Sequence, residues 1–291
     1  MFKLSDKFHE IRGNYYGKRF LPSTVEYALD YKPRSRDRIM LTYPKSGTWW
    51  AEFIVTQLMA QGRKPDTNEL FYRKYFLEYH GKALLDREVG KSSKELGEVT
   101  FIRSHLAFKL FPYRPEPRYL LLLRNPKDVC VSFYLYFKEV FEMEIDFKEY
   151  FKLWISGKSE LPFGDYFEAV RDYWSHRDDP NCTLVIYEYM LANPAQGVRQ
   201  IASFLGPKYV ARLNERESDT GESLLEQVVR ESSFNAMKGS LNKSDPHFRS
   251  GKAGDWRSHL NRPESDAIDA RAAQVWAGTG LLELWKREMD W

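Results

Sequence analysis

The chain has 291 residues, with 44 Lys and Arg, 41 Asp and Glu, and 2 Cys. A chain of this length builds a core without disulfides or structural metals, and 43 % hydrophobic with 29 % charged residues excludes intrinsic disorder. The net charge of +3 excludes a protein that coats a polyanion such as nucleic acid. With only Cys130 and Cys182, the chain has neither a disulfide framework nor a multi-cysteine zinc site.

The first residues, MFKLSDKFHEIRG, are charged and lack the apolar segment of a secretory signal. The longest aliphatic run, 120–123, is far shorter than the roughly 20 residues that a membrane helix needs. We therefore expect a soluble cytoplasmic protein without a membrane or nucleic-acid partner.

Strand-like and helix-like segments alternate along the chain. We expect strands at 39–43, 99–102, 118–123 and 183–186, and helices at 49–61, 126–141, 166–174 and 194–205. The run 118–123, RYLLLL, is apolar enough for a strand buried on both faces of a sheet. The alternation predicts an α/β fold, a single three-layer domain over 1–291 with a central parallel sheet.

Two regions interrupt this alternation. Residues 62–97 have no sustained period and are expected to form an irregular excursion over the edge of the sheet. Residues 238–257, KGSLNKSDPHFRSGKAGDWR, are expected to form a long loop with a basic cluster. A loop this long inside a compact domain is usually functional or disordered.

The sequence PKSGT at 44–48 follows an expected strand and precedes an expected helix. Backbone N–H groups at such a turn bind anions, and Lys45 adds a positive charge. The order differs from the nucleotide P-loop, GxxxxGK[ST], because Lys45 precedes Gly47. The pattern predicts a P-loop-like phosphate site, with an ordinary strand-to-helix turn as the alternative.

The strand 118–123 ends at Arg124, where ATP- and GTP-cleaving proteins carry an aspartate that helps to hold Mg²⁺. A cation there argues against a magnesium–triphosphate site and favours direct binding of a phosphate by the guanidinium fork. Asp128 lies inside the next helix and is a poor substitute for the missing acid. A surface ion pair is the alternative interpretation of Arg124.

Five segments together resemble the cytosolic sulfotransferase family. They are TYPKSGTWW (42–50), FIRSHL (101–106), LLRNPKDVCVSFYLYFK (122–138), VIYEYMLANP (185–194) and FRSGKAGDWR (248–257). They occur in the family's order and cover nearly the whole chain. The resemblance implies a single α/β domain that transfers a sulfonate from 3′-phosphoadenosine-5′-phosphosulfate (PAPS) to a hydroxyl or amine of a small molecule, with adenosine 3′,5′-bisphosphate (PAP) as product. Such a donor needs two basic phosphate sites and no metal.

The resemblance also assigns residues to the donor. Those implied around the 5′-phosphosulfate are Lys45, Ser46, Gly47, Thr48 and Trp49. Those implied around the 3′-phosphate are Arg124, Ser132, Arg249, Ser250 and Gly251. The adenine is expected to stack between Trp50 and Phe234, with hydrogen bonds to Tyr187 and Ser232. The alternative for Trp50 and Phe234 is a purely structural role in the core.

For catalysis, the resemblance implies His105 as the general base and Lys45 as the cation that stabilises the departing phosphate oxygen. Independently of the family, His105 follows an expected strand, a setting that the other five histidines lack. In the family, the serine matching Ser132 also holds the lysine away from the donor until the acceptor binds. This limits wasteful hydrolysis of the donor.

The chain departs from the family at four places. Arg103, which we also expect to take part in catalysis, replaces a lysine two positions before the histidine. Trp49 replaces a threonine, and Ser250 replaces the lysine of RKG. We therefore expect weaker donor binding than a full match would give. The dimer signature KTVE is absent from 257–266, RSHLNRPESD, which predicts a monomer or a weak homodimer.

The acceptor pocket is expected to be rich in aromatic side chains. Its predicted contributors are 62–97, Phe108, Tyr136, Phe137, Phe141 and 14–22. Such a pocket suits flat rings such as phenols, catecholamines or steroids. Two other functions remain open: a P-loop kinase or hydrolase, which Arg124 disfavours, and a non-catalytic adenosine-bisphosphate-binding protein, which Trp49 and Ser250 support.

Overall fold

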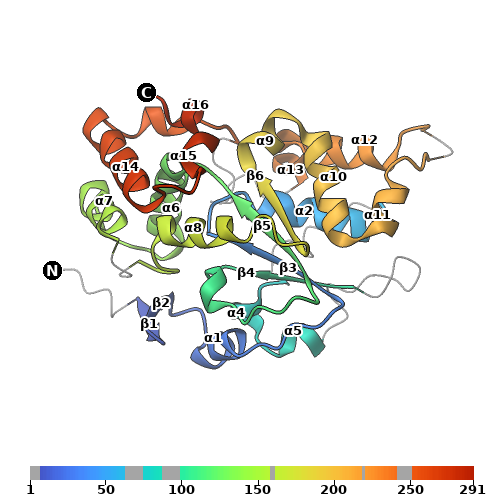
Figure 1. Cartoon of the computed structure of the whole chain (residues 1–291), viewed down its shortest axis with the longest axis horizontal. Coiled ribbons are helices and arrows are strands. Elements are labelled where there is room, and N and C mark those ends of the chain that lie inside the picture. Colours follow the sequence, from blue (N-terminus) through green and yellow to red (C-terminus); the bar gives the residue numbers. More distant parts are fainter. Residues whose placement is uncertain (1–6, 63–74, 87–98, 158–160, 218–219, 241–250) are drawn as a thin grey trace.

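The computed structural model describes residues 7–62, 75–86, 99–157, 161–217, 220–240 and 251–291 (Figure 1). A four-stranded parallel sheet lies at its centre, in the order β4-β3-β5-β6. Its strands are β3 (Asp37–Thr42), β4 (Thr100–Ser104), β5 (Arg118–Leu123) and β6 (Cys182–Ile186). The four predicted strands are therefore confirmed. Leu41 pairs with Ser104 on one side and Leu121 on the other, so the carboxyl ends of β3, β4 and β5 meet at one edge.

Helices cover both faces of the sheet, which gives the predicted three layers (Figure 1). Met40 and Leu120 point to one face and pack with α2 (Thr48–Met59) and α10 (Pro194–Leu205). The alternate residues Leu41 and Leu121 point to the other face. There they pack with α6 (Pro126–Val140), α8 (Tyr166–Ser175) and α14 (Arg262–Val275). Burial on both faces explains why β5 is a continuous run of leucines.

The remaining elements surround these layers. A hairpin of β1 (Phe8–Ile11) and β2 (Asn14–Gly17) precedes α1 (Pro22–Leu29). The other helices are α4 (Leu77–His80), α5 (Ala83–Asp86), η2 (Phe108–Leu110), α7 (Phe147–Ser156), α9 (Tyr187–Ala192), α11 (Pro207–Arg212), α12 (Leu224–Glu231), α13 (Phe234–Ser240), η3 (Asp255–Ser258), α15 (Leu281–Leu284) and α16 (Lys286–Met289).

Local sequence explains how the helices begin at the sheet edge. The Asn125 side chain accepts the N–H of Asp128, and Pro126 occupies the first turn of α6. Asn193 and Pro194 begin α10 in the same way. Of the predicted irregular excursion at 62–97, residues 63–74 and 87–98 lie outside the described residues. Between them lie the single-turn helices α4 and α5, which are too short to produce a period in the sequence.

The predicted loop at 238–257 is partly helical. Residues 238–240 end α13 and 255–258 form η3, whereas 241–250 lie outside the described residues. Within the described ranges, the model contains no helix long and apolar enough to cross a bilayer.

Candidate active site

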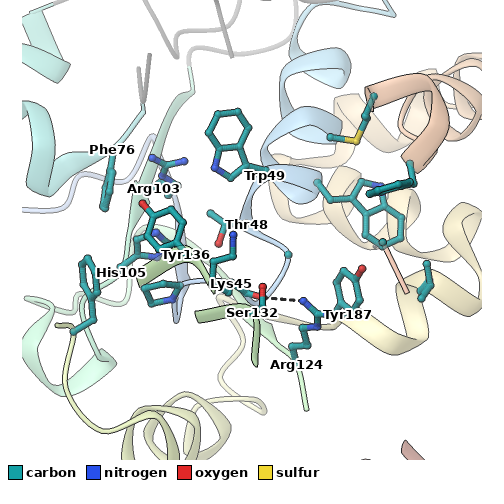
Figure 2. Close-up of a pocket in the computed structure, with 18 of the residues that line it drawn as sticks. Lys45, Thr48, Trp49, Phe76, Arg103, His105, Arg124, Ser132, Tyr136 and Tyr187 are labelled. Carbon is teal, nitrogen blue, oxygen red and sulfur yellow. Dashed lines mark hydrogen bonds between the residues drawn. The ribbon is translucent and has the colours of Figure 1, made fainter. Parts of the chain in front are cut away.

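One cavity opens at the edge where β3, β4 and β5 end (Figure 2). It brings together most of the predicted site residues: Lys45, Gly47, Thr48, Trp49, Trp50, Arg103, His105, Arg124, Ser132, Tyr187, Ser232, Phe234 and Gly251. Ser46 is buried beside the cavity but does not line it. Arg249 and Ser250 lie outside the described residues.

The 44–48 loop connects β3 to α2. Gly47, at the start of α2, has φ +99°, and a Cβ there would lie 2.6 Å from Cδ2 of Tyr187. Only glycine fits this turn without strain. Among the described residues, the buried hydroxyls of Ser46 and Thr48 have no hydrogen-bond partner. Unpaired buried hydroxyls beside a helix N-terminus suit an anionic ligand that accepts hydrogen bonds from them.

Arg124 follows β5 and is 7 % exposed. Its Nη1 donates to the Lys45 carbonyl over 3.1 Å, and its Nη2 donates to the Lys252 carbonyl over 3.3 Å. The guanidinium also lies 4.2 Å from the centre of the Tyr187 ring. Its Nη2 also lies 4.0 Å from the Asp128 carboxylate. This ion pair is buried between the 44–48 loop and the segment that begins at Gly251, so the alternative of a surface ion pair is wrong.

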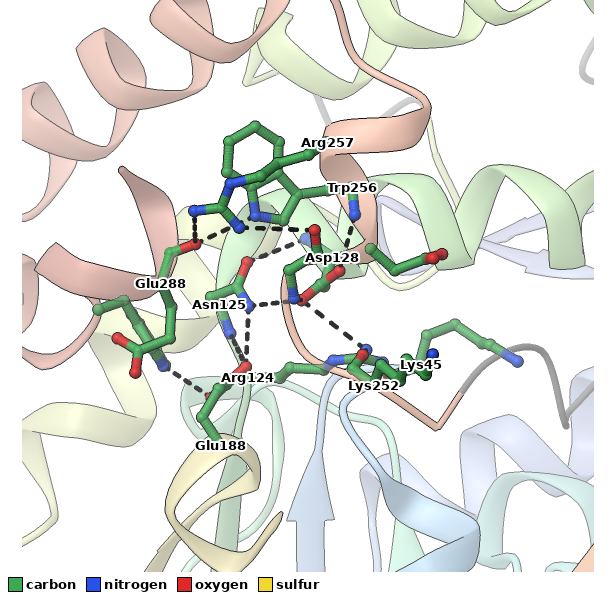
Figure 3. Close-up of polar contacts among 12 residues, drawn as sticks. Lys45, Arg124, Asn125, Asp128, Glu188, Lys252, Trp256, Arg257 and Glu288 are labelled. Carbon is green, nitrogen blue, oxygen red and sulfur yellow. Dashed lines mark hydrogen bonds and ion pairs between the residues drawn. The ribbon is translucent and has the colours of Figure 1, made fainter. Parts of the chain in front are cut away.

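Asp128 holds that segment between Lys252 and Trp256 (Figure 3). Its carboxylate accepts the backbone N–H groups of Gly254 over 2.7 Å and Trp256 over 3.2 Å, and the Asn125 amide over 2.8 Å. Asp128 thus holds the loop of the GDW motif against the end of β5. Apart from its position three residues after Asn125, at the start of α6, nothing in the sequence indicated a role for Asp128 at the site.

Glu188 supports the same region from α9. Its Oε1 accepts the backbone and side-chain N–H groups of Asn125 over 3.1 and 2.9 Å, and its Oε2 accepts Nε1 of Trp285 over 2.9 Å. Burial raises the pKa of Glu188, and the charge of Arg124 opposes this shift. Lys127, fully buried, donates to Ser265 over 2.7 Å and so attaches α6 to α14.

The predicted adenine residues line another part of the cavity. The Trp50 and Tyr187 rings meet edge to face with centres 5.6 Å apart. Phe234 lies against Gly251, since a Cβ at Gly251 would be 2.3 Å from Cδ2 of the ring. Ser232 is 1 % exposed and ends α12. These positions are compatible with adenine stacking, which stays a prediction.

His105 follows β4 and is 9 % exposed. Its Nδ1 lies 2.7 Å from the carbonyl oxygen of Thr42. Because a carbonyl only accepts, this contact assigns the ring proton to Nδ1 and leaves Nε2 as an acceptor. The imidazole meets the Phe76 and Phe163 rings edge to face at 4.8 and 5.5 Å.

Arg103 is paired with a carboxylate that the sequence analysis missed. Its Nη1 lies 2.5 Å from Oε2 of Glu52 on α2, and both side chains are 3 % exposed. Burial raises the pKa of Glu52, and Arg103 opposes that shift. The guanidinium also lies over the Phe76 ring at 4.3 Å. The charge of Arg103 is therefore largely matched by Glu52.

Lys45 and Ser132 reach the cavity from two different elements, the 44–48 loop and α6 (Figure 2). The Lys45 ammonium lies over the Tyr136 ring, 4.7 Å from its centre. Ser132 is 7 % exposed. The helical spacing from Asp128 to Ser132 places both side chains on the face of α6 that meets the site.

The apolar wall near His105 is formed by Phe20, Phe76, Tyr136 and Phe163. Tyr136 and the 14–22 segment were predicted, but Phe163 was not, because its φ of +69° places it in a turn without periodicity.

Three other predicted contributors to the acceptor pocket are wrong. Phe108 stacks on His176 at 3.6 Å, away from the cavity. Phe137 and Phe141 pack against Phe8, with ring centres 5.7 and 5.4 Å away. Their aromatic character favoured a ring-binding pocket but does not show which surface each side chain contacts.

No group of three or more His, Cys, Asp or Glu side chains is arranged to hold a metal ion in the part of the chain that the model describes.

Residues 35–280 match a family model described as "Sulfotransferase domain". The chain is 26 % identical to sulfotransferase 1E1 of Cavia porcellus, with 94 % of each protein covered. It is 28 % identical to sulfotransferase 6B1 of Mus musculus, with 98 % of this chain and 91 % of the relative covered.

Two solved structures share the fold. Mouse sulfotransferase SULT7A1 complexed with PAP superposes with a TM-score of 0.74 at 18 % identity, covering 97 % of this chain and 99 % of the other. Retinol dehydratase in a complex with retinol and PAP gives 0.68 at 19 % identity, covering 92 % and 88 %.

Proposed function

Because this chain belongs to the sulfotransferase domain family and is an enzyme that moves a sulfonate from PAPS to a small acceptor, we propose a role for each part of its cavity. PAPS lies against the 44–48 loop and Arg124, and the acceptor hydroxyl lies against His105. The observation that carries this assignment is the Nδ1 contact of His105 with the Thr42 carbonyl, which leaves Nε2 able to take a proton within the same cavity as Lys45 and Arg124.

The donor has two anionic ends. The 5′-phosphosulfate takes the amides and hydroxyls of the 44–48 loop, and the 3′-phosphate takes Arg124 and Ser132, with Arg249, Ser250 and Gly251 completing that site. The adenine stacks between Trp50 and Phe234, beside Tyr187 and Ser232. Two observations support this arrangement: the hydroxyls of Ser46 and Thr48 and the Nε of Arg124 lack partners among the described residues, and both structural relatives were solved with PAP.

The transfer is an in-line displacement at sulfur. His105 Nε2 takes the proton of the acceptor hydroxyl as the oxygen bonds to sulfur, and the bond from sulfur to the 5′-phosphate oxygen breaks. Lys45 stabilises the negative charge that develops on that oxygen. PAP and the sulfonated acceptor leave, and the imidazolium returns its proton to water. Ser132 restrains Lys45 before the acceptor binds.

The acceptor is a flat, largely apolar molecule with a hydroxyl or amine, such as a phenol, a catecholamine or a steroid. Phe20, Phe76 and Phe163 support this proposal because they wall the cavity beside His105. The 15 % aromatic content of the chain thus serves the acceptor side as well as the core.

We also propose that the chain is a single domain over 1–291, that it acts in the cytoplasm without nucleic-acid or membrane partners, and that it is a monomer or weak homodimer. The missing KTVE signature supports weak association. Light scattering across a concentration series tests it.

Labelled PAPS with a panel of phenols, catecholamines and steroids, with and without EDTA, tests the function. We expect sulfonate transfer with PAP as product, unaffected by EDTA, whereas a magnesium-dependent kinase would stop. The His105→Ala variant is expected to lose about 10³-fold in kcat while PAP affinity stays unchanged by calorimetry. A His105→Ala variant that transfers sulfonate at the parent rate would contradict the mechanism.

A further inference from the structure

Residues 75–80 cover the free edge of β4. In the order β4-β3-β5-β6, β4 is an edge strand, and the N–H groups on its outer side need partners. The Arg103 N–H donates to the Tyr75 carbonyl over 2.7 Å. The next outward N–H belongs to His105, and it donates to Oε1 of Glu78 over 2.6 Å. A carboxylate thus replaces a strand partner at the histidine.

Glu78 holds the turn after β4 as well as one amide. Its Oε1 also accepts the Ser104 hydroxyl over 3.1 Å, and the same hydroxyl accepts the N–H of Leu106 over 3.1 Å. The N–H of His105 and the N–H of Leu106 are therefore fixed by the Glu78 carboxylate and the Ser104 hydroxyl, respectively. Glu78 is fully buried, and its Oε2 has no partner among the described residues.

The helix that carries Glu78 is itself held on α1. The Glu78 carbonyl accepts the Thr24 hydroxyl over 2.7 Å. Gly81 ends α4 with φ +52°, and a Cβ there would lie 3.2 Å from Cα of Thr24. This close approach leaves α4 little room to move, so Glu78 is a fixed point for the turn that it binds.

We propose that Glu78 is a positioning residue for His105, holding the backbone of the histidine while the Thr42 carbonyl holds its ring. The two contacts come from different elements, α4 and β3, and together they set the direction of Nε2. Phe76 adds a third contact from the same segment, 4.8 Å from the imidazole. The inference rests on the role proposed above for His105.

The charges around Glu78 support an ionisable anchor. Burial raises the pKa of Glu78 to about 7, while the bonds from the His105 N–H and Ser104 and the charge of Arg103 on β4 lower it. Among the described residues, the other titratable groups that face it are Tyr16 on β2 and Tyr173 on α8, whose pKa values are raised mainly by burial and further by the charge of Glu78. The ionised carboxylate accepts a stronger hydrogen bond than the neutral acid does.

Two substitutions at Glu78 separate the effect of its hydrogen-bond-accepting oxygen from the effect of its negative charge. Glu78→Gln keeps an oxygen that accepts the His105 N–H, so we expect kcat to fall about 3- to 10-fold. Glu78→Leu keeps the bulk but removes the acceptor, and we expect a loss of about 100-fold in kcat, because a small displacement of a catalytic group has that effect. In both variants the KM for PAPS and the PAP affinity stay unchanged.

Asp37→Asn is the matched control. Asp37 is also fully buried and accepts the Tyr31 hydroxyl over 2.5 Å and the Arg34 amide over 2.7 Å. It begins β3, at the opposite end of the strand from Thr42. We expect this variant to lose thermal stability but to keep the parent kcat, because its carboxylate touches neither β4 nor the cavity.

The tautomer of the His105 ring is a measurable property that a general loss of stability does not change. In ¹⁵N-histidine-labelled protein, the long-range ¹H–¹⁵N spectrum of the parent should show His105 as the Nδ1–H tautomer, assigned by its absence from His105→Ala. Glu78→Leu should show a mixture of tautomers. A Glu78→Leu variant with the parent kcat or an unchanged tautomer overturns the inference.

If Glu78→Leu does not fold by circular dichroism, Glu78→Gln decides: the parent kcat in that variant overturns the inference. If His105→Ala retains activity, the proposed function fails instead. If His105→Ala loses activity while both Glu78 variants behave as the parent, only the positioning role fails.

Discussion

The two sides of the cavity are built differently. On the donor side, Arg124 and the 44–48 loop are connected through Asp128 to the segment that begins at Gly251, by hydrogen bonds to backbone groups. On the acceptor side, His105 lies among aromatic rings, and among the described residues Thr42 holds its ring and Glu78 holds its backbone N–H. The contacts described above are mainly polar on the donor side and mainly aromatic around the imidazole of His105.

This difference follows from the ligands. The donor always presents the same phosphates, so a rigid polar site is suited to it. The acceptor presents a ring, and an apolar wall has few groups with which to orient a base. Each polar contact on the acceptor side therefore carries more of the geometry, and substitutions should show the asymmetry.

Among the substitutions on the donor side, Lys45→Ala is expected to give the largest effect. Removing the cation that stabilises the leaving oxygen should lower kcat about 10²- to 10³-fold, as loss of one oxyanion-stabilising donor does. Single-turnover kinetics with labelled PAPS measure it. If kcat falls less than tenfold, the leaving group is stabilised by another residue and the donor side is not organised around Lys45.

Glu78→Gln should change how stability depends on pH. Burial raises the pKa of Glu78 from its usual 4.5 to about 7, so the folded chain retains a proton that the unfolded chain has lost. The contribution of this proton to the free energy of unfolding is complete below pH 4.5 and disappears as the pH rises to about 7. At 1.36 kcal/mol for each pKa unit, the free energy of unfolding of the parent should fall by up to about 3 kcal/mol over this range. The free energy of unfolding of Glu78→Gln should not show this fall.

Urea unfolding of both proteins at pH 4.5, 6 and 8 measures that difference. Parallel curves for the parent and Glu78→Gln would show that the carboxylate does not titrate in this range, and the acceptor side would then lack its ionisable anchor.

Arg124→Ala should weaken PAP binding about 10- to 100-fold, since a hydrogen bond to a charged group contributes about 1.5–3 kcal/mol. The kcat at saturating donor should change less than threefold, because Arg124 is assigned to the 3′-phosphate, away from the transferred group. Calorimetry with PAP gives the affinity, and Arg124→Lys, which keeps the charge without the fork, is the control. A fall in kcat without a loss of affinity would place Arg124 at the reacting end.

Ser250→Lys should give the smallest effect. Restoring the cation that the family carries at this position is expected to tighten PAP binding about 2- to 5-fold, the range of an exposed ion pair. An unchanged PAP affinity would show that Ser250 does not weaken the donor side.

The sequence predicted the donor side better than the acceptor side, for a physical reason. The donor motifs that contain Lys45 and Arg124 are each contiguous and each include the end of a strand, so the parallel sheet alone brings these residues to one edge, and it brings His105 there in the same way. The pairs Glu52–Arg103 and Glu78–His105 join residues 51 and 27 positions apart, on elements whose packing no local period reveals.

The aromatic residues of α6 show the same limit. The sequence predicted a helix over 126–141, where α6 lies, but did not distinguish Tyr136, which faces the cavity, from Phe137, which packs against Phe8. Neighbouring residues on a helix point about 100° apart, so one position decides between core and cavity.

The same geometry makes the length of α6 as important as its composition. Lys127 reaches α14, Asp128 holds the Gly254 loop and Ser132 faces the cavity, all within two turns. Inserting one residue between Asp128 and Ser132 would rotate everything beyond it by about 100° and turn Ser132 out of the cavity. Natural variation in this helix should therefore occur by replacement of single side chains, while insertions and deletions collect in the connections outside it.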